Sequence, residues 1–239
     1  MKDSELKFDH TCHVLYSQKC REVIQKKIAL HYPKDRQDYE WEKVQNQYVT
    51  FLSDFRKDLG GKKNFHNRTA GTYDCIALMS YYVICKENSS VTEMEEMNNE
   101  LLLPSFQKLS FVNCNQELYR KLLDLSFKVA EKKCQKWNDY EMKVKPYIKG
   151  GPVRYEFTAC PIAQFAKDYD LLEVLPSFCN GDYAAMELLH VKLIRNTTCG
   201  NGNICDYTIY GDEDKRLQEY VEYVDEEGYR RNRKVRNVK

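Results

Sequence analysis

Long apolar segments and an excess of charge of one sign are both missing from this 239-residue sequence. The formal net charge is +1, so no global field attracts the chain to nucleic acid or to an acidic surface. The first ten residues are polar and contain no apolar core of a secretory signal. The most apolar run, residues 75–85, is too short to span a bilayer. We therefore expect a cytoplasmic protein without a nucleic-acid or membrane partner.

Several familiar motifs are also absent. The sequence has no C-x-x-C pair, no H-E-x-x-H, no G-x-S-x-G and no glycine-rich phosphate loop. No internal repeat and no low-complexity segment occurs. Any catalytic or binding site must therefore be built from residues outside these motifs.

Cysteine, in contrast, is abundant, with ten residues. In a reducing compartment such residues are thiols, metal ligands or catalysts rather than structural disulfides. A secreted, disulfide-bonded protein is the alternative, because the count is even.

The first 150 residues have the spacing of helices. Apolar residues recur at three- and four-residue intervals, and caps, glycines and prolines separate the segments. We expect helices over residues 14–30, from Asp35 or Asp38 to 59, over 73–86, from about 92 to 103 before Pro104, and from Asn113 or Asn115 onward. The segment 73–86 is apolar nearly all round, which indicates a buried helix. The last helix has an amphipathic face made of Leu118, Leu122, Leu125, Val129 and Trp137.

The period changes to two at Val153, which is typical of a half-buried strand over 153–158. Three short helices are expected next, over 161–167, up to about Pro176, and over 182–189. Two strands are expected over 191–198 and 204–210, and the residues Gly200–Asn203 between them are typical of a hairpin turn. The predicted fold is α+β, with a helical subdomain (1–150), a strand-helices-hairpin unit with a small antiparallel sheet (151–212) and a charged tail (213–239) that is a solvated helix or disordered.

Cys160 is the strongest candidate for chemistry. It ends the predicted strand and directly precedes Pro161, a residue favoured at the first helical position, so Cys160 falls near an N-cap. Unpaired N–H groups and the helix dipole stabilise a thiolate there. A buried structural cysteine is the alternative.

Other polar residues lie in the same unit. Asp182 follows Cys179 in the segment C-N-G-D. Its carboxylate can act as a general base or bind a cationic part of a substrate. Alternatively, Asp182 only caps the helix, and Asn180 is a second candidate for that cap. Cys205 and Asp206 are neighbours in a strand, so only one of them can face a given pocket. Either of two strand arginines, Arg154 and Arg195, can bind a substrate carboxylate or lie in solvent.

We expect no cofactor. A bound metal ion is the alternative, because four cysteines lie in this unit. Cys160, Cys179, Cys199 and Cys205 form a possible four-sulfur zinc site, with His190 as a substitute ligand. The five-residue separation of Cys199 and Cys205 is loose for such a site.

The segments F-T-A-C-P-I-A-Q-F, L-P-S-F-C-N-G-D-Y-A and R-N-T-T-C-G-N-G-N-I-C-D-Y resemble the L-2-amino-thiazoline-4-carboxylic acid hydrolase family. The resemblance covers about residues 153–212. The matching positions are Cys160, Cys179, Asp182, Gly202, Cys205 and Asp206. Cys199 departs from the family pattern.

The resemblance implies a hydrolase that opens a small cyclic amidine or isothiourea, such as 2-amino-thiazoline-4-carboxylate, by hydrolysing a C–N or C–S bond; in the named reaction the C–S bond breaks. It suggests Cys160, Asp182 and Cys205 as catalytic residues, with Cys160 as the thiolate nucleophile. Cys179, Arg195, Asp206 and His190 are the expected substrate-binding residues: Asp182 or Asp206 holds the amidine, and Arg195 holds the carboxylate. The alternatives are a metal-dependent hydrolase and a non-enzymatic ligand-binding module. A homo-oligomer is possible in each case.

Overall fold

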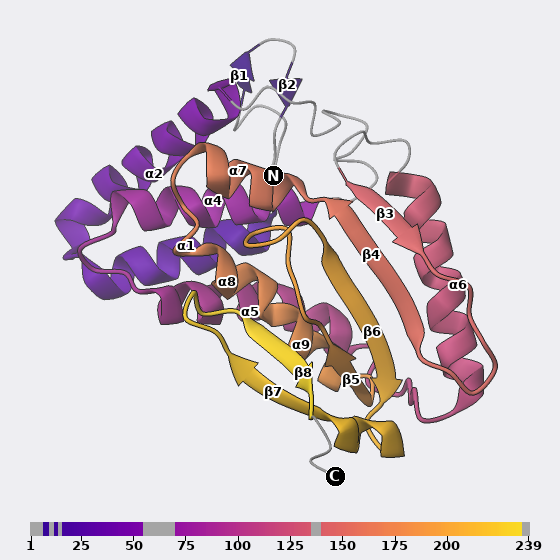
Figure 1. Cartoon of the computed structure of the whole chain (residues 1–239). Helices are drawn as coiled ribbons and strands as arrows, with labels where there is room; N and C mark the ends of the chain where they lie inside the picture. Colours follow the sequence, from indigo (N-terminus) through magenta and orange to yellow (C-terminus); the bar gives the residue numbers. More distant parts are fainter. Residues whose placement is uncertain (1–6, 10–11, 14–15, 55–69, 135–139, 236–239) are drawn as a thin grey trace. The chain divides into compact units, whose positions relative to one another are not determined.

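The computed structural model describes residues 7–9, 12–13, 16–54, 70–134 and 140–235 (Figure 1). The chain forms two compact units, one made of residues 1–101 and 137–139 and the other of residues 102–136 and 140–239. None of the described helices combines the length and the apolar character needed to cross a bilayer.

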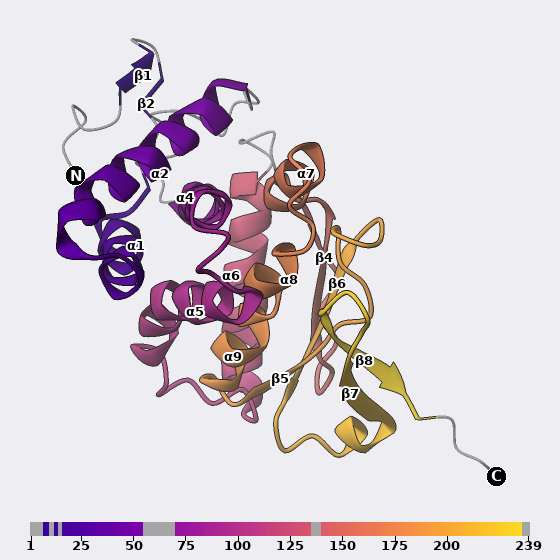
Figure 2. The same cartoon turned by 90° about the vertical axis from the view of Figure 1, so that its left-hand side faces the viewer.

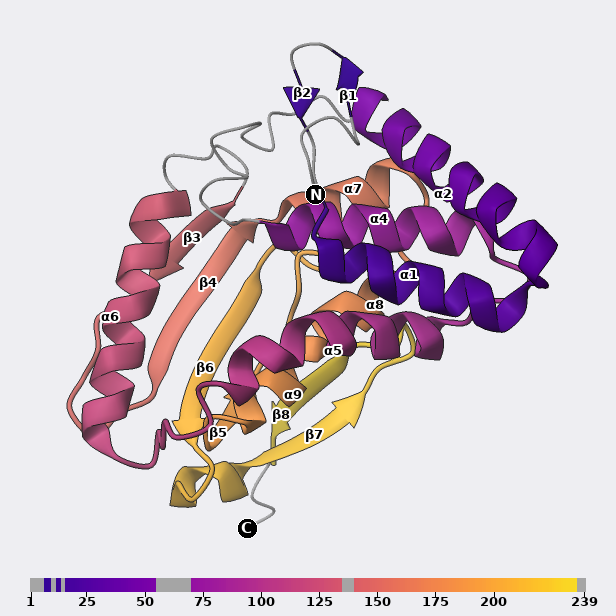
Figure 3. The same cartoon turned by 180° about the vertical axis from the view of Figure 1, so that it is seen from behind.

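The first unit is mainly helical. Its core is built by α1, α2 and α4, which pack against one another (Figure 3). The middle of α4 is buried nearly all round, as its composition predicts. A short antiparallel strand pair and the start of α5 complete the unit. The element bounds are β1 (Lys7–Asp9), β2 (Cys12–His13), α1 (Gln18–His31), α2 (Lys34–Asp54), α4 (Ala70–Ile84) and α5 (Val91–Gln107).

Ser17 links two helices of this unit. Its hydroxyl caps α1 by accepting from the Cys20 amide at 3.1 Å. The same hydroxyl donates to Asp74 of α4 at 2.9 Å, and the Ser17 amide donates to the other Asp74 oxygen at 2.6 Å. An N-cap is thereby joined to a carboxylate 57 residues away.

The prediction that the fourth helix ends before Pro104 is wrong, because α5 continues to Gln107. Pro104 lies in the last turn, where its missing N–H removes one helical hydrogen bond near the end of the helix. The predicted end of α2 at Leu59 lies outside the described residues.

The second unit contains a four-stranded antiparallel sheet in the order β3-β4-β6-β5. The strands are β3 (Glu141–Val144), β4 (Val153–Ala159), β5 (Val191–Ile194) and β6 (Cys205–Gly211). With the helices that precede it, this sheet confirms the predicted α+β fold. Strand β3 was not predicted from the sequence.

Helices cover one face of this sheet (Figure 2). They are α6 (Glu117–Cys134), α7 (Pro161–Asp168), α8 (Leu175–Cys179) and α9 (Gly181–Glu187), of which α6 packs on β3 and β4 and α9 on β5. Tyr155 of β4 stacks on Tyr207 of β6 and meets Phe127 of α6, with ring centroids 4.4 and 4.3 Å apart. The helix-covered face therefore carries an aromatic layer. The prediction that a short helix ends near Pro176 is wrong, since α8 begins there, as suits proline in a first turn.

The apolar stripe of α6 lies at the surface rather than in a core. Leu118, Leu122, Leu125 and Val129 are 64%, 52%, 58% and 48% exposed. The helix rests on the sheet through its opposite side, where Phe127 lies against Tyr155. Trp137, the fifth member of the predicted face, lies outside the described residues.

The described part of the C-terminal segment forms a hairpin, so the expectation of a solvated helix or a disordered tail is wrong for residues 215–234. A 3₁₀ turn (Lys215–Glu219) leads into β7 (Tyr220–Val224), which pairs with β8 (Arg230–Lys234). Alternating ion pairs and aromatic contacts, not a long apolar pattern, hold this hairpin, and the sequence pattern therefore did not reveal it.

Candidate functional site

Cys160 is the N-cap of α7, as the sequence predicts. Its backbone is extended (φ −134°, ψ 116°), and Pro161 occupies the first turn. The residue joins the end of β4 to the start of α7 and is partly exposed. A strand, a proline and a helix thus fix the position of this thiol.

Asp182, in the first turn of α9, is the centre of the polar cluster. Its Oδ2 atom accepts from the Arg195 Nη1 at 3.1 Å and from the Tyr207 hydroxyl at 2.8 Å. Its Oδ1 atom has no hydrogen-bond partner among the described residues, and the side chain is 35% exposed. One oxygen is fixed by the protein while the other is available to a ligand. Asn180, not Asp182, is the N-cap of this helix.

Arg195 is fully buried. Its Nη1 also donates to the Cys179 carbonyl at 3.0 Å, and its guanidinium lies over the rings of Tyr183 and Tyr207 at 5.0 and 5.7 Å. Its Nε and Nη2 atoms are buried and have no partner among the described residues. An unpaired buried donor on a charged group is costly, so these two atoms mark a position where a polar partner is favoured.

Three thiols, those of Cys160, Cys179 and Cys205, lie close enough to Asp182 or Arg195 to interact with them electrostatically. Cys179 ends α8 beside Arg195, and Cys205 interacts with both Cys160 and Cys179. The Cys199 amide donates to the Cys205 sulfur at 3.1 Å. The nine cysteines from Cys20 to Cys205 are all free thiols. The structure therefore brings Cys160, Cys179, Cys205, Asp182 and Arg195 into one cluster.

Burial governs the acidity of these groups. It raises the pKa of Cys160 to about 12, and the amides of Ala163 and Ile162, which lower it, do not offset this effect. Burial likewise raises the pKa of Cys179 well above its usual value. The pKa of Asp182 is raised because the surrounding protein removes part of the hydration of its carboxyl group, although 35% of the side chain is exposed; Arg195 and Tyr207 oppose this rise. The helix N-terminus alone therefore does not make Cys160 a thiolate at neutral pH.

Asp206 and His190 are not brought to this cluster. Asp206 accepts from the amides of Asn196 and Thr197 at 2.9 and 2.7 Å, and so holds the loop that follows β5. His190 lies at the surface beside Asp212, with its Nδ1 3.3 Å from the carboxylate. The substrate-binding roles of both residues remain predictions. Arg154 lies on the opposite face of the sheet from Cys205.

The metal alternative has no ligand set within the part of the chain that the structure describes. No three of its His, Cys, Asp or Glu side chains are placed to share one ion. The four cysteines of the proposed zinc site are near one another but do not converge on one point.

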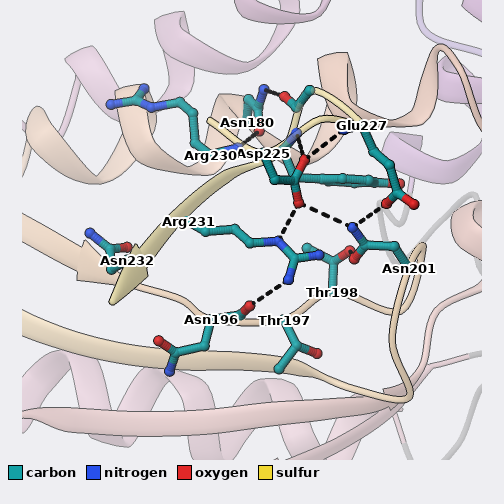
Figure 4. Close-up of polar contacts among 12 residues, drawn as sticks. Asn180, Asn196, Thr197, Thr198, Asn201, Asp225, Glu227, Arg230, Arg231 and Asn232 are labelled. Atoms are coloured by element: carbon teal, nitrogen blue, oxygen red, sulfur yellow. Dashed lines mark hydrogen bonds and ion pairs between the residues drawn. The ribbon is translucent and has the colours of Figure 1, made fainter. Parts of the chain in front are cut away.

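The C-terminal hairpin contacts the loop of Asn196 and Thr197, which directly follows Arg195 in the sequence (Figure 4). Asn232, which is 2% exposed, accepts through its side chain from the Arg195 amide at 3.0 Å and from the Tyr183 hydroxyl at 2.9 Å. Arg231 donates to the Asn196 carbonyl at 2.9 Å. A Cβ at Gly200 would collide with the Tyr229 hydroxyl, which explains why this position needs glycine.

Tyr207 and Asn232 were missed as site residues. The alternation of β6 puts Tyr207 on the same face as Cys205 and could have identified it. No signal in the sequence points to Asn232, which comes from a hairpin 37 residues beyond Arg195.

Comparison with known proteins gives one family. No curated protein and no solved structure matches the chain. Residues 67–209, more than half of the chain, match the family described as L-2-amino-thiazoline-4-carboxylic acid hydrolase. The match includes Cys160, Cys179, Asp182, Arg195 and Cys205 and ends before the C-terminal hairpin. The chain therefore belongs to the L-2-amino-thiazoline-4-carboxylic acid hydrolase family.

Proposed function

We propose that this protein hydrolyses a small cyclic isothiourea such as 2-amino-thiazoline-4-carboxylate, by attack at C2 and cleavage of the ring C–S bond. The observation that carries the proposal is the asymmetry of Asp182. Arg195 and Tyr207 occupy its Oδ2, while Oδ1 has no protein partner among the described residues. The amidine part of the substrate presents N–H donors and becomes cationic on protonation, and so matches a fixed carboxylate oxygen.

The remaining polar group of the substrate is its carboxylate. Arg195 is the cation of the cluster, and its Nε and Nη2 have no partner among the described residues. A carboxylate accepts two parallel hydrogen bonds from such a pair of guanidinium donors. Because Arg195 is fully buried, we assign it first to holding Asp182 in place. Its second role is to bind the substrate carboxylate, and this binding requires the surrounding side chains to move apart.

Cys160 is the proposed nucleophile. Its sulfur attacks C2, the ring sulfur leaves as the cysteine thiol, and an enzyme-bound isothiourea remains. Water then attacks the same carbon, Cys160 leaves as a thiol, and N-carbamoyl-cysteine is released. With a pKa of about 12 in the free protein, Cys160 must lose its proton when the substrate is bound. A bound amidinium favours this loss, because a nearby positive charge stabilises a thiolate.

The raised pKa of Cys160 also favours a second mechanism for the same reaction. In that mechanism Asp182 acts as general base on a water molecule, and the thiols only shape the site. The raised pKa of Asp182 suits a general base better than an ordinary aspartate pKa would.

The test is incubation with 2-amino-thiazoline-4-carboxylate, with the product followed by mass spectrometry. We expect turnover by the native chain and its loss in Asp182→Asn. Loss of turnover in Cys160→Ala together with a covalent adduct on the native chain supports the nucleophile, whereas retained turnover in Cys160→Ala supports the water mechanism. Cys114→Ala, a buried cysteine elsewhere in the same unit, is the matched control. Absence of turnover by the folded native chain would reject the proposed substrate.

A further inference from the structure

A cavity of about 410 Å³ lies on the sheet face opposite to the Asp182 cluster. Arg154 of β4 and Thr208 and Tyr210 of β6 form its floor. The loop around Lys149 and the segment around Arg216 form its walls. This volume falls in the range of small-molecule sites, roughly 300–1,000 Å³.

Strand alternation separates this cavity from the cluster. Arg154 pairs with Thr208 across β4 and β6, and the next pair along the strands is Tyr155 with Tyr207. Successive strand residues point to opposite faces. The pair Tyr155–Tyr207 belongs to the helix-covered face with Asp182, so Arg154 and Thr208 belong to a different surface.

The lining of the cavity is positively charged. It contains Lys149, Arg154 and Arg216 and no carboxylate. Asp214 neutralises Arg216 through two contacts, at 2.9 and 2.5 Å. Arg154 and Lys149 have no side-chain hydrogen bond or ion pair to any residue in the described ranges. Two uncompensated positive charges therefore face one cavity.

Arg216 connects the parts of the wall. It also donates to the Gly150 carbonyl at 2.8 Å and lies over the Tyr210 ring at 5.0 Å. These contacts tie the loop around Lys149 to β6 and to the start of the C-terminal segment. Lys149 and Arg154 line the cavity together with the hydroxyl-bearing residues Thr208, Tyr210 and Tyr220.

We propose that this cavity is a second ligand site, which binds a small dianion that carries carboxylate or phosphate groups. Arg154 forms a two-pronged contact with one anionic group, Lys149 neutralises the second charge, and the hydroxyls donate to the remaining oxygens. The proposal is independent of the reaction at Asp182, because it uses none of the residues of that cluster.

Isothermal titration of the full chain with succinate and, separately, with inorganic phosphate tests the proposal and distinguishes the two ligand sources. We expect saturable binding of at least one anion, absence of binding by uncharged succinamide, and an affinity that falls with salt concentration. Arg154→Gln should weaken binding by about tenfold or more, because a charge-assisted contact is lost.

Two variants serve as controls. Lys143→Gln removes an equal charge from the exposed strand β3, outside the cavity, and Asp182→Asn alters the cluster on the other face. Both should retain the native affinity within about twofold. Failure of both anions to bind, equal binding by Arg154→Gln, or an equal loss in Lys143→Gln would overturn the proposal.

Discussion

The ion pair between Asp182 and Arg195 allows a sharp test, because its two members are buried to different extents. Arg195 has no exposed surface, while the Asp182 side chain is 35% exposed. Asp182→Ala leaves a charged guanidinium enclosed without its carboxylate. Arg195→Met removes the charge, keeps much of the volume and leaves a carboxylate that still contacts solvent and Tyr207.

The expected costs follow from this difference. Breaking a buried pair by removing one partner costs about 3–5 kcal/mol when the other remains enclosed, so Asp182→Ala should fall in this range. Arg195→Met should cost about 1–3 kcal/mol, because the remaining carboxylate is partly hydrated. The double variant should lose less than the sum of the two, with a coupling free energy of at least about 1.5 kcal/mol.

Urea unfolding at neutral pH of the native chain, the two single variants and the double variant gives these values, provided that their m-values agree. A changed m-value in one variant would show that the substitution had altered the compactness of the native or unfolded state, so that its effect was not confined to the ion pair. A larger loss from Arg195→Met than from Asp182→Ala, or simple additivity in the double variant, would refute the reasoning.

Three other predictions concern stability. Burial raises the pKa of Asp74 to about 6, so the contribution of Asp74 to the free energy of unfolding should fall by about 2–3 kcal/mol as the pH rises from about 4 to 6. The difference in unfolding free energy between the native chain and Asp74→Asn, measured at several pH values, should fall by this amount, and a constant difference would contradict the prediction. Leu122→Glu and Leu125→Glu should each change stability by less than about 0.5 kcal/mol, against about 2–5 for the buried control Ile24→Ala; a concentration-dependent loss would instead indicate self-association through the stripe. Asn232→Ala should cost about 1–3 kcal/mol in urea unfolding, because it leaves the buried Arg195 amide without its acceptor, while the Tyr183 hydroxyl keeps the Arg230 carbonyl; an unchanged midpoint would contradict that role.

Local patterns were sufficient to predict the elements that position the site. The pattern change at Val153 predicts β4, and the C-P pair predicts that Cys160 caps α7. The C-N-G-D segment places Asp182 at the start of a helix, although the cap is Asn180. These features depend on neighbours a few residues away, which a sequence shows directly.

Properties that depend on long-range packing could not be predicted in this way. The leucines of α6 have the spacing of a core stripe, yet the helix uses its other side against the sheet. The dipole argument for Cys160 is correct in sign, but burial outweighs it. The sequence left open whether Arg195 binds a carboxylate or lies in solvent, and its enclosure depends on Tyr183, Tyr207 and a hairpin outside the family match.

Both proposed sites depend on the register of β4 and β6, because residues of the two sites alternate along these two strands. A slip of one residue would exchange the two faces. Asp206 holds the neighbouring loop through Asn196 and Thr197 at the end where β6 begins. We therefore expect Asp206→Ala to impair both turnover and anion binding, whereas Arg154→Gln should impair anion binding alone. Kinetic and titration measurements on the two variants check this, and normal anion binding by a folded Asp206→Ala protein with impaired turnover would instead favour a direct role of Asp206 in substrate binding.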